Sequence, residues 1–208
     1  LNNSAQKYVD NDDSNEANKL LDYQSTEAEN KLRIEETVRK DDWKINYGAG
    51  IEWAEYTTTT FQKLENEVTL NYSSEIGVFK YVAFGQVSKG VLSERLQLSL
   101  GARMDANNFN AHMANPLNQF SPRLSASYSL SQKMAINFNT GIYYQLPPYT
   151  TLGYRNTAGE LVNKDVKYIQ SKHVVLGIEY NTSKNARITV EGFYKHYSNY
   201  PMDLLDSI

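Results

Sequence analysis

The sequence contains no cysteine and only five prolines among its 208 residues. The missing cysteines exclude a scaffold stapled by disulfide bonds and metal sites built on thiolates. No stretch approaches the roughly 20 consecutive apolar residues of a membrane-spanning helix, which excludes a helical membrane protein. The formal net charge is only -3, and no basic stripe indicates a nucleic-acid partner. A membrane β-barrel is not excluded, because only every second residue of its strands faces lipid.

The motifs of enzymes and metal sites are also missing. No serine lies in a Gly-x-Ser-x-Gly turn, there is no phosphate-binding loop, and the three histidines are isolated from other metal ligands. Asp10, Asp12 and Ser14 imitate the start of a calcium loop. Asn15 and Leu21, however, stand where that loop needs glycine and glutamate. We therefore expect no enzyme, no cofactor and no metal site.

Aromatic residues are abundant: 16 tyrosines, seven phenylalanines and two tryptophans. Such residues favour strands, and Tyr and Trp also favour the boundary between lipid and water. Polar and apolar residues alternate most clearly over residues 95–105, where Leu96, Leu98, Leu100, Ala102 and Met104 share one face. The same period recurs over residues 43–53, 123–130, 133–142 and 173–180. This alternation predicts an all-β protein.

We predict an antiparallel meander of eight long strands, at about residues 29–39, 42–57, 78–90, 94–107, 121–131, 133–146, 168–182 and 186–199. Tight turns alternate with long connections, which we place at about 58–77, 108–120 and 147–167. Turns at one rim and loops at the other are typical of outer-membrane barrels. If the turns are periplasmic, both chain ends lie on the extracellular side. We therefore expect part of a larger barrel.

Residues 1–28 differ from the rest of the chain. They are polar and acidic, with few β-branched side chains. We expect an extracellular loop or a disordered segment here, with a short helix over residues 17–21 as the alternative.

Four short motifs resemble TonB-dependent receptors. Residues 121–128 (SPRLSASY) resemble the S-P-R-L-x-x-x-Y strand of that family, and residues 101–105 (GARMD) resemble its G-x-R-x-D strand. Residues 177–180 (GIEY) and 191–195 (EGFYK) look like its late-barrel pair, and the ending is especially similar to receptors of the Bacteroidetes type. The resemblance covers about residues 75–201. The family's plug domain and TonB box have no counterpart in this sequence.

The resemblance implies part of a transmembrane barrel of about 22 strands in the cell outer membrane. It implies import of a scarce, bulky nutrient ligand such as a siderophore, cobalamin, an oligosaccharide or a peptide. A plug domain of the same parent chain would gate the lumen, and the TonB complex would act through that plug. Outer-membrane lipid would surround the apolar faces. Two alternatives stay open: a soluble or surface-anchored all-β ligand-binding module, and a complete eight-stranded outer-membrane barrel.

Two groups of side chains are candidates for function. The charged residues predicted to face the lumen are Arg95, Arg103, Asp105, Arg123, Glu179, Glu191 and Lys195. They either guide substrate and plug or form cross-strand ion pairs in a wet interior, and we favour the ion pairs.

The long connection at 147–167 is the ligand candidate, with Tyr143, Tyr144, Gln145, Tyr149, Tyr154, Arg155 and Asn156 as contacts. The alternative is an aromatic girdle beside an ordinary loop. Tyr194, Tyr197 and Tyr200 are predicted to belong to the girdle.

Overall fold

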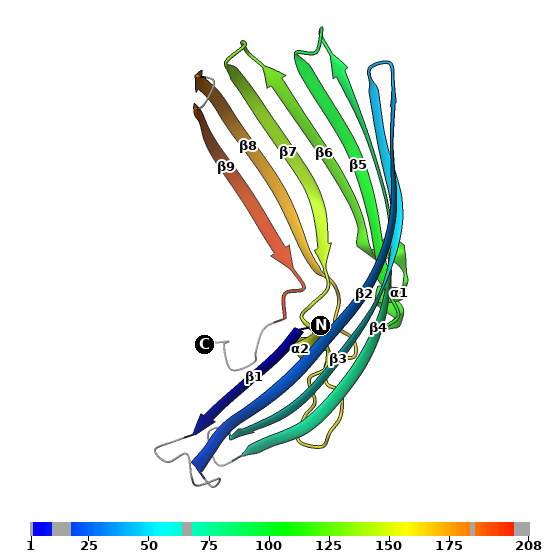
Figure 1. Ribbon diagram of the computed structural model, residues 1–208, viewed down its shortest axis with the longest axis vertical. Helices are drawn as coiled ribbons and strands as arrows, with labels where there is room; N and C mark the ends of the chain where they lie inside the picture. Colours follow the sequence, from blue (N-terminus) through cyan, green and yellow to red (C-terminus); the bar gives the residue numbers. More distant parts are fainter. Residues whose placement is uncertain (1, 10–17, 64–67, 184–185, 202–208) are drawn as a thin grey trace.

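The structure, a computed structural model of the chain, describes residues 2–9, 18–63, 68–183 and 186–201. These residues form one curved antiparallel sheet whose nine strands follow the order of the sequence (Figure 1). The strands are β1 (Asn2–Val9), β2 (Lys19–Lys40), β3 (Trp43–Lys63), β4 (Thr69–Val91), β5 (Leu96–Asn107), β6 (Phe120–Ser129), β7 (Met134–Gln145), β8 (Ile169–Ser183) and β9 (Ala186–Ser198). The predicted antiparallel meander is confirmed.

Two of the three predicted long connections are present, after β5 and after β7, whereas the one between β3 and β4 is much shorter than predicted. Short turns join β2 to β3, β4 to β5 and β6 to β7 at one rim of the sheet, at the top of Figure 1. The long connections after β5 and β7 lie toward the opposite rim. They contain α1 (Ala111–Ala114) with a 3₁₀ turn, η3 (Pro116–Gln119), and α2 (Tyr149–Leu152). We call the edge of the sheet with the short turns the turn rim, and the edge with the long connections the loop rim.

Two predictions about the first third of the chain are wrong. Residues 2–9 and 19–28, expected outside the sheet, form β1 and the first part of β2, so the described residues contain nine strands and not eight. The connection expected at 58–77 is strand over 58–63 and 69–77. The run Thr57–Thr60 explains the longer strand, because β-branched residues suit a pleated sheet even where no lipid imposes alternation. The imitated calcium loop at Asp10, Asp12 and Ser14 lies outside the described residues.

One face of the sheet, which we call the outer face, carries an apolar band. In β3 it runs from Trp43 to Trp53, ten residues further on, through alternate residues that include Ile45 and Ile51. Ten residues of strand extend about 33 Å, which a tilt of about 40° reduces to roughly 25 Å, the height of the apolar band of outer-membrane barrels. At the turn rim the Lys89 ammonium lies 4.7 Å from the centre of the Trp43 ring.

No second layer covers the band in the described part of the chain. Leu100 is 58 % and Leu176 is 55 % exposed. A soluble module would bury such residues beneath a second sheet. Strands β1 and β9 lie at opposite edges of the single sheet, so a closed eight-stranded barrel is also wrong. In the described residues, no helix has the length and apolar character needed to cross a bilayer.

Candidate functional site

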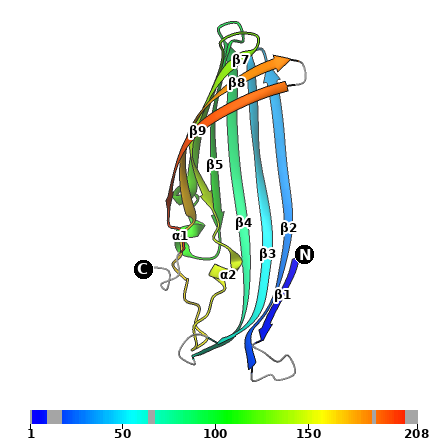
Figure 2. The ribbon, with the colours of Figure 1, turned by 90° about the vertical axis from the view of Figure 1, so that its left-hand side faces the viewer.

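The other face of the sheet, the inner face, is polar and concave, and the long connection between β7 and β8 folds onto it. Figure 2 shows α2 and this loop on the side toward which β8 and β9 curve. The loop lies over the inner face of β3 in the half of this strand that is nearer the loop rim. Ala54 and Tyr56 are each only 1 % exposed there. The wall and the loop therefore form one surface that faces the lumen.

Tyr149 of α2 is the main anchor of the loop. Its hydroxyl accepts a hydrogen bond from Lys80 Nζ (2.6 Å) and donates one to Glu29 Oε1 (2.7 Å). Its ring stacks on Tyr56, with the centroids 6.0 Å apart. Burial, followed by the nearby carboxylate of Glu29, raises the pKa of Tyr149 well above its ordinary value. The phenol is therefore neutral at physiological pH and holds the loop by hydrogen bonds.

Beneath Tyr149, two acidic and two basic side chains neutralise one another. Lys31 Nζ lies 2.6 Å from Glu29 Oε2 and 3.2 Å from Glu52 Oε2. Lys80 forms an ion pair with each of the same carboxylates. The hydrogen bond from Lys31 is the largest of the causes that lower the pKa of Glu29 to about 2. This network is a charge-balanced platform for the loop.

Three further residues predicted to contact ligand also hold the loop. Arg155 Nε donates to Ser74 Oγ of β4 (3.2 Å). The Tyr154 ring meets Tyr72 edge-on, with the centroids 5.9 Å apart. The Asn156 Oδ1 atom accepts hydrogen bonds from two backbone N–H groups of the turn that follows it. The sequence predicts these residues as ligand contacts because the loop is rich in aromatic and hydrogen-bonding side chains. In the structure each of them contacts another part of the protein.

The three predicted residues at the end of β7, where the loop begins, lie in three different environments. Tyr144 packs against a small buried cluster of Met113, Leu152 and Tyr168 from the two long connections, and its hydroxyl accepts from Gln170 Nε2 (2.6 Å). Burial is the largest cause that raises the pKa of Tyr168 to about 12. Gln145 is the exposed last residue of β7. Tyr143 lies on the inner face in a different group.

That group is a transverse row on the inner face. Arg123, Gly141, His173 and Lys195 lie directly opposite one another on β6, β7, β8 and β9. We call these four residues the Arg123–Lys195 row. The Tyr143 ring lies beside it, with the Arg123 guanidinium 4.6 Å from its centre and the His173 ring stacked at 4.7 Å. An arginine, a tyrosine and a histidine from three strands are therefore in contact.

Tyr197 of β9 joins this group, since its ring meets His173 edge-on at 6.5 Å. Its predicted place in the lipid-facing girdle is wrong, because residue 197 has the inward parity of the strand. Nothing in the local sequence marks His173 as a member of this group. Counting residues outward from the tight turn at 130–133 pairs 123 with 141, and counting from the turn that the sequence predicts between β8 and β9 pairs 173 with 195. The local sequence does not set the register of these two pairs, because a long connection separates β7 from β8.

The remaining charged candidates occupy separate places. Arg103 and Asp105 form a two-pronged ion pair on the inner face, with Nη2–Oδ1 at 2.7 Å and Nε–Oδ2 at 2.8 Å. Glu179 lies 3.8 Å from an arginine of β9, and the Glu191 side chain leans over Gly177. Arg95, by contrast, lies in the β4–β5 turn and donates to the backbone oxygen of Ser129.

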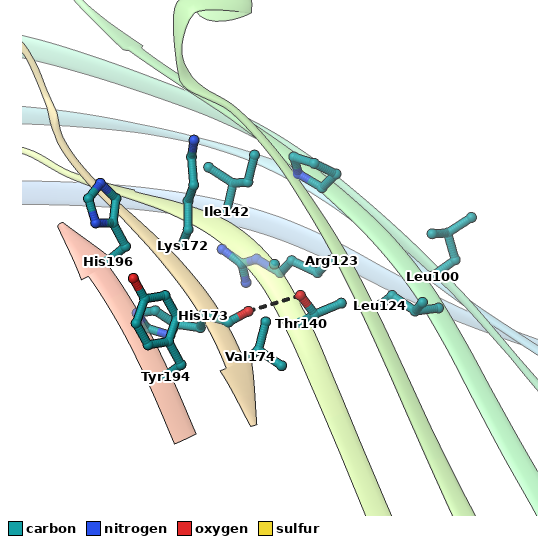
Figure 3. A pocket seen from close by; sticks show the side chains of 12 residues that line it. Leu100, Arg123, Leu124, Thr140, Ile142, Lys172, His173, Val174, Tyr194 and His196 are labelled. Atoms are coloured by element: carbon teal, nitrogen blue, oxygen red, sulfur yellow. Dashed lines mark hydrogen bonds between the residues drawn. The ribbon is translucent and has the colours of Figure 1, made fainter. Parts of the chain in front are cut away.

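The outer face carries a shallow groove of about 620 Å³ at the same level (Figure 3). Leu100 and Leu124 line one end, and Lys172 and His196 lie on adjacent strands at the other. At its centre, Thr140 Oγ1 donates to the carbonyl oxygen of His173 (2.9 Å). The lining is mainly apolar, as expected for a surface in contact with acyl chains. Across the described ranges, no three His, Asp or Glu side chains are grouped as a metal site.

Comparisons with known proteins agree with this architecture. The family described as "TonB dependent receptor-like, beta-barrel" matches residues 1–207. No curated protein sequence matches the chain.

Among solved structures, the copper transporter OprC is similar at 18% identity and a TM-score of 0.63, over 86% of this chain and 31% of OprC. The outer membrane transporter YddB from Escherichia coli follows at 16% identity and 0.56, over 84% and 26%. A ferric enterobactin receptor mutant from Pseudomonas aeruginosa (PfeA) matches at 15% identity and 0.56, over 88% and 28%. The chain thus spans less than a third of each, and these identities show a shared fold alone.

Proposed function

The chain belongs to the TonB-dependent receptor β-barrel family, a family of outer-membrane transporters and receptors and not of enzymes, and from this premise we propose that it imports a scarce, bulky nutrient as part of a larger receptor. Its nine strands would form part of the wall of a barrel of about 22 strands. A plug domain elsewhere in the parent chain would close the lumen. The TonB complex would drive transport through that plug.

The observation that supports the proposal is the division of the sheet into two faces. The outer face presents exposed apolar residues such as Leu100 on β5, Leu176 on β8 and Val190 on β9, with no covering layer in the described residues. The inner face carries ion pairs and the docked loop. In a bilayer every backbone group must find a partner within the protein, and a closed antiparallel wall meets that requirement.

The halves of β2, β3 and β4 that are nearer the loop rim extend beyond the apolar band. We propose that residues 19–29, 54–63 and 69–78 stand outside the membrane and carry the loop of α2 as a rigid extracellular wall. Tyr149 and Arg155 fix the loop to this wall, and a fixed loop presents a preformed surface to a ligand. Nutrient would pass between this surface and the rest of the barrel. Tyr143 lies on that path, on the inner face.

Siderophores, cobalamin, oligosaccharides and peptides are the candidate cargo. Two of the similar structures are named for copper and for ferric enterobactin, so metal ions and ferric chelates are the first to test. The ending over residues 191–201 supports the further proposal that the receptor is of the Bacteroidetes type.

The test is growth of cells that carry or lack the whole receptor, with each candidate nutrient supplied in turn as the limiting source. We expect one nutrient to support growth only when the receptor and TonB are both present. The receptor should be recovered in the outer-membrane fraction and should migrate differently on a gel before and after boiling. Recovery in a soluble fraction, or growth independent of TonB, would contradict the proposal.

A further inference from the structure

The Arg123–Lys195 row differs from the rest of the inner face in its charge balance. Elsewhere along the lumen, cations meet carboxylates: Lys31 and Lys80 pair with Glu29 and Glu52, and Arg103 pairs with Asp105. At the turn rim, Arg39 and Lys44 are exposed to water. Among the described residues, by contrast, Arg123 and Lys195 form no ion pair and no side-chain hydrogen bond, although they lie well away from that rim.

Aromatic rings support both of these cations. The Arg123 guanidinium lies over the Tyr143 ring, and the Lys195 ammonium lies 5.2 Å from the centre of the Phe193 ring. A ring face attracts a cation but accepts none of its N–H groups in a regular hydrogen bond. The rings therefore position the two cations while their donors stay available to a ligand.

The geometry of the row sets the size of what it can hold. Three inter-strand spacings separate Arg123 from Lys195, which is about 14 Å. His173 lies between them, and the missing side chain of Gly141 lets the Tyr143 ring pack against Arg123. Tyr197 and Phe193 offer further ring surface, at 54 % and 69 % exposure. The row thus combines two separated positive charges with flat, accessible faces.

We infer that the Arg123–Lys195 row is a binding site for an anionic ligand that carries a planar ring. The guanidinium fork of Arg123 matches carboxylate, phosphate or sulfonate oxygens, and Lys195 supplies a second charge. The ring of the ligand stacks on Tyr197 or Phe193. This inference rests on the proposed import function, because the row lies on the inner face through which cargo would pass.

The probe is 8-hydroxypyrene-1,3,6-trisulfonate, a planar fluorescent trisulfonate, titrated into the full-length receptor in detergent while fluorescence anisotropy is recorded. Proflavine, a planar cation, serves as the probe of opposite charge. We expect the trisulfonate to bind saturably and proflavine not to bind. Replacing both cations (R123Q with K195Q) should weaken trisulfonate binding by roughly tenfold or more, since each charged hydrogen bond is worth about that factor.

The matched control is Arg39→Gln with Lys44→Gln, which likewise removes two inner-face positive charges, but at the turn rim. It should leave trisulfonate affinity within about twofold of the wild type, because exposed charges beyond a Debye length are screened. An equal loss in the control would mean that general attraction by the lumen causes binding, which overturns the site. No binding to the full receptor would overturn it as well, because the row would then be covered, for example by acidic residues of the plug.

A growth assay on the nutrient of the receptor separates this inference from the proposed function. If the nutrient is imported but the trisulfonate does not bind, the binding site is wrong and the proposed function stands. If cells with the wild-type receptor show no TonB-dependent growth, the proposed function is wrong. Heat-modifiable migration of every variant confirms that the barrel has folded.

Discussion

Tyr149 donates a hydrogen bond of 2.7 Å to Glu29, a residue 120 positions earlier in the chain. The same hydroxyl accepts from Lys80, 69 positions earlier. One phenol therefore ties the loop between β7 and β8 to strands β2 and β4. This contact converts a long surface loop into a fixed part of the lumen wall.

Tyr149→Phe should release the loop, because it leaves the ring stacked on Tyr56 but removes both hydrogen bonds. We expect the free energy that favours the docked loop to fall by about 1–3 kcal/mol. The chain has no cysteine, so Ala158→Cys in the exposed turn of the loop can carry a single nitroxide label. Its spectrum should show faster motion in the Tyr149→Phe background.

Tyr154→Phe is the matched control for this change. The hydroxyl of Tyr154 makes no hydrogen bond with a described residue, and its ring contact with Tyr72 survives the substitution. Label motion should stay at the wild-type value. Equal loosening in the two variants would show that the Tyr149 hydroxyl does not anchor the loop.

Acid should loosen the same loop through Glu29. Its pKa is lowered from 4.5 to about 2, chiefly by the hydrogen bond from Lys31. Lys31 contacts Glu29 whether or not the loop is docked, so only the part of the lowering that comes from the Tyr149 hydroxyl stabilises the docked loop. That part is fully present above the unperturbed pKa and is lost as pH falls toward the lowered value. The label at position 158 should therefore be immobile at pH 5 and become mobile between pH 4.5 and 2.

Glu29→Gln should remove this dependence and leave the label mobile at neutral pH. A loop that stays immobile down to pH 2 in the wild type, or one whose acid response survives in Glu29→Gln, would contradict the assignment to this carboxylate.

The sequence predicted β5 to β9 with ends within two residues of those observed, and the reason is the bilayer. Lipid on one side and water on the other impose strict alternation, as over Leu96–Leu100. Beyond the membrane that constraint is absent. The run Thr58–Thr60 is polar on both faces, so alternation does not predict it as strand, although it extends β3.

The candidate site is harder to predict from the sequence than the strands are, because its contacts join distant parts of the chain. Composition indicated the aromatic loop, but nothing in the local sequence relates Tyr149 to Glu29 or Arg155 to Ser74. The alignment of Arg123 with His173 depends on the register of β7 with β8, and the long connection between these two strands does not set it. Register is specific once the turns are placed, yet a single residue of uncertainty moves every side chain to the other face.

The apolar outer face makes a direct prediction about membrane insertion. Leu176 is 55 % exposed and lies in the middle of the band, so Leu176→Arg would place a charge in hydrocarbon. Such a substitution costs about 2–4 kcal/mol at the bilayer midplane. We expect a lower folded fraction of the receptor in lipid vesicles, measured by heat-modifiable migration.

Asn139→Arg introduces the same side chain on the inner face, on the strand adjacent to Leu176. It should fold as well as the wild type, because the lumen is wet. If the two arginines had equal effects, the assignment of the faces to lipid and lumen would be wrong.

Gly141→Ala tests whether the Arg123–Lys195 row depends on close packing. A Cβ atom at this position would lie 3.0 Å from the Pro122 carbonyl oxygen, 3.1 Å from the Tyr143 ring and 3.2 Å from Arg123 Cγ. The ring must shift to admit it, and Arg123 then loses part of its aromatic support. We expect trisulfonate affinity to fall by about two- to fivefold, the value of a partly exposed cation–π contact.

Gly85→Ala is the control, because a Cβ atom there meets no described atom within 4 Å. Trisulfonate affinity should be unchanged in that variant. Unchanged affinity in Gly141→Ala as well, while the R123Q and K195Q pair abolishes binding, would show that the two cations act without the Tyr143 ring. The ligand would then be selected by charge alone, and non-aromatic polyanions should compete as strongly as the planar probe.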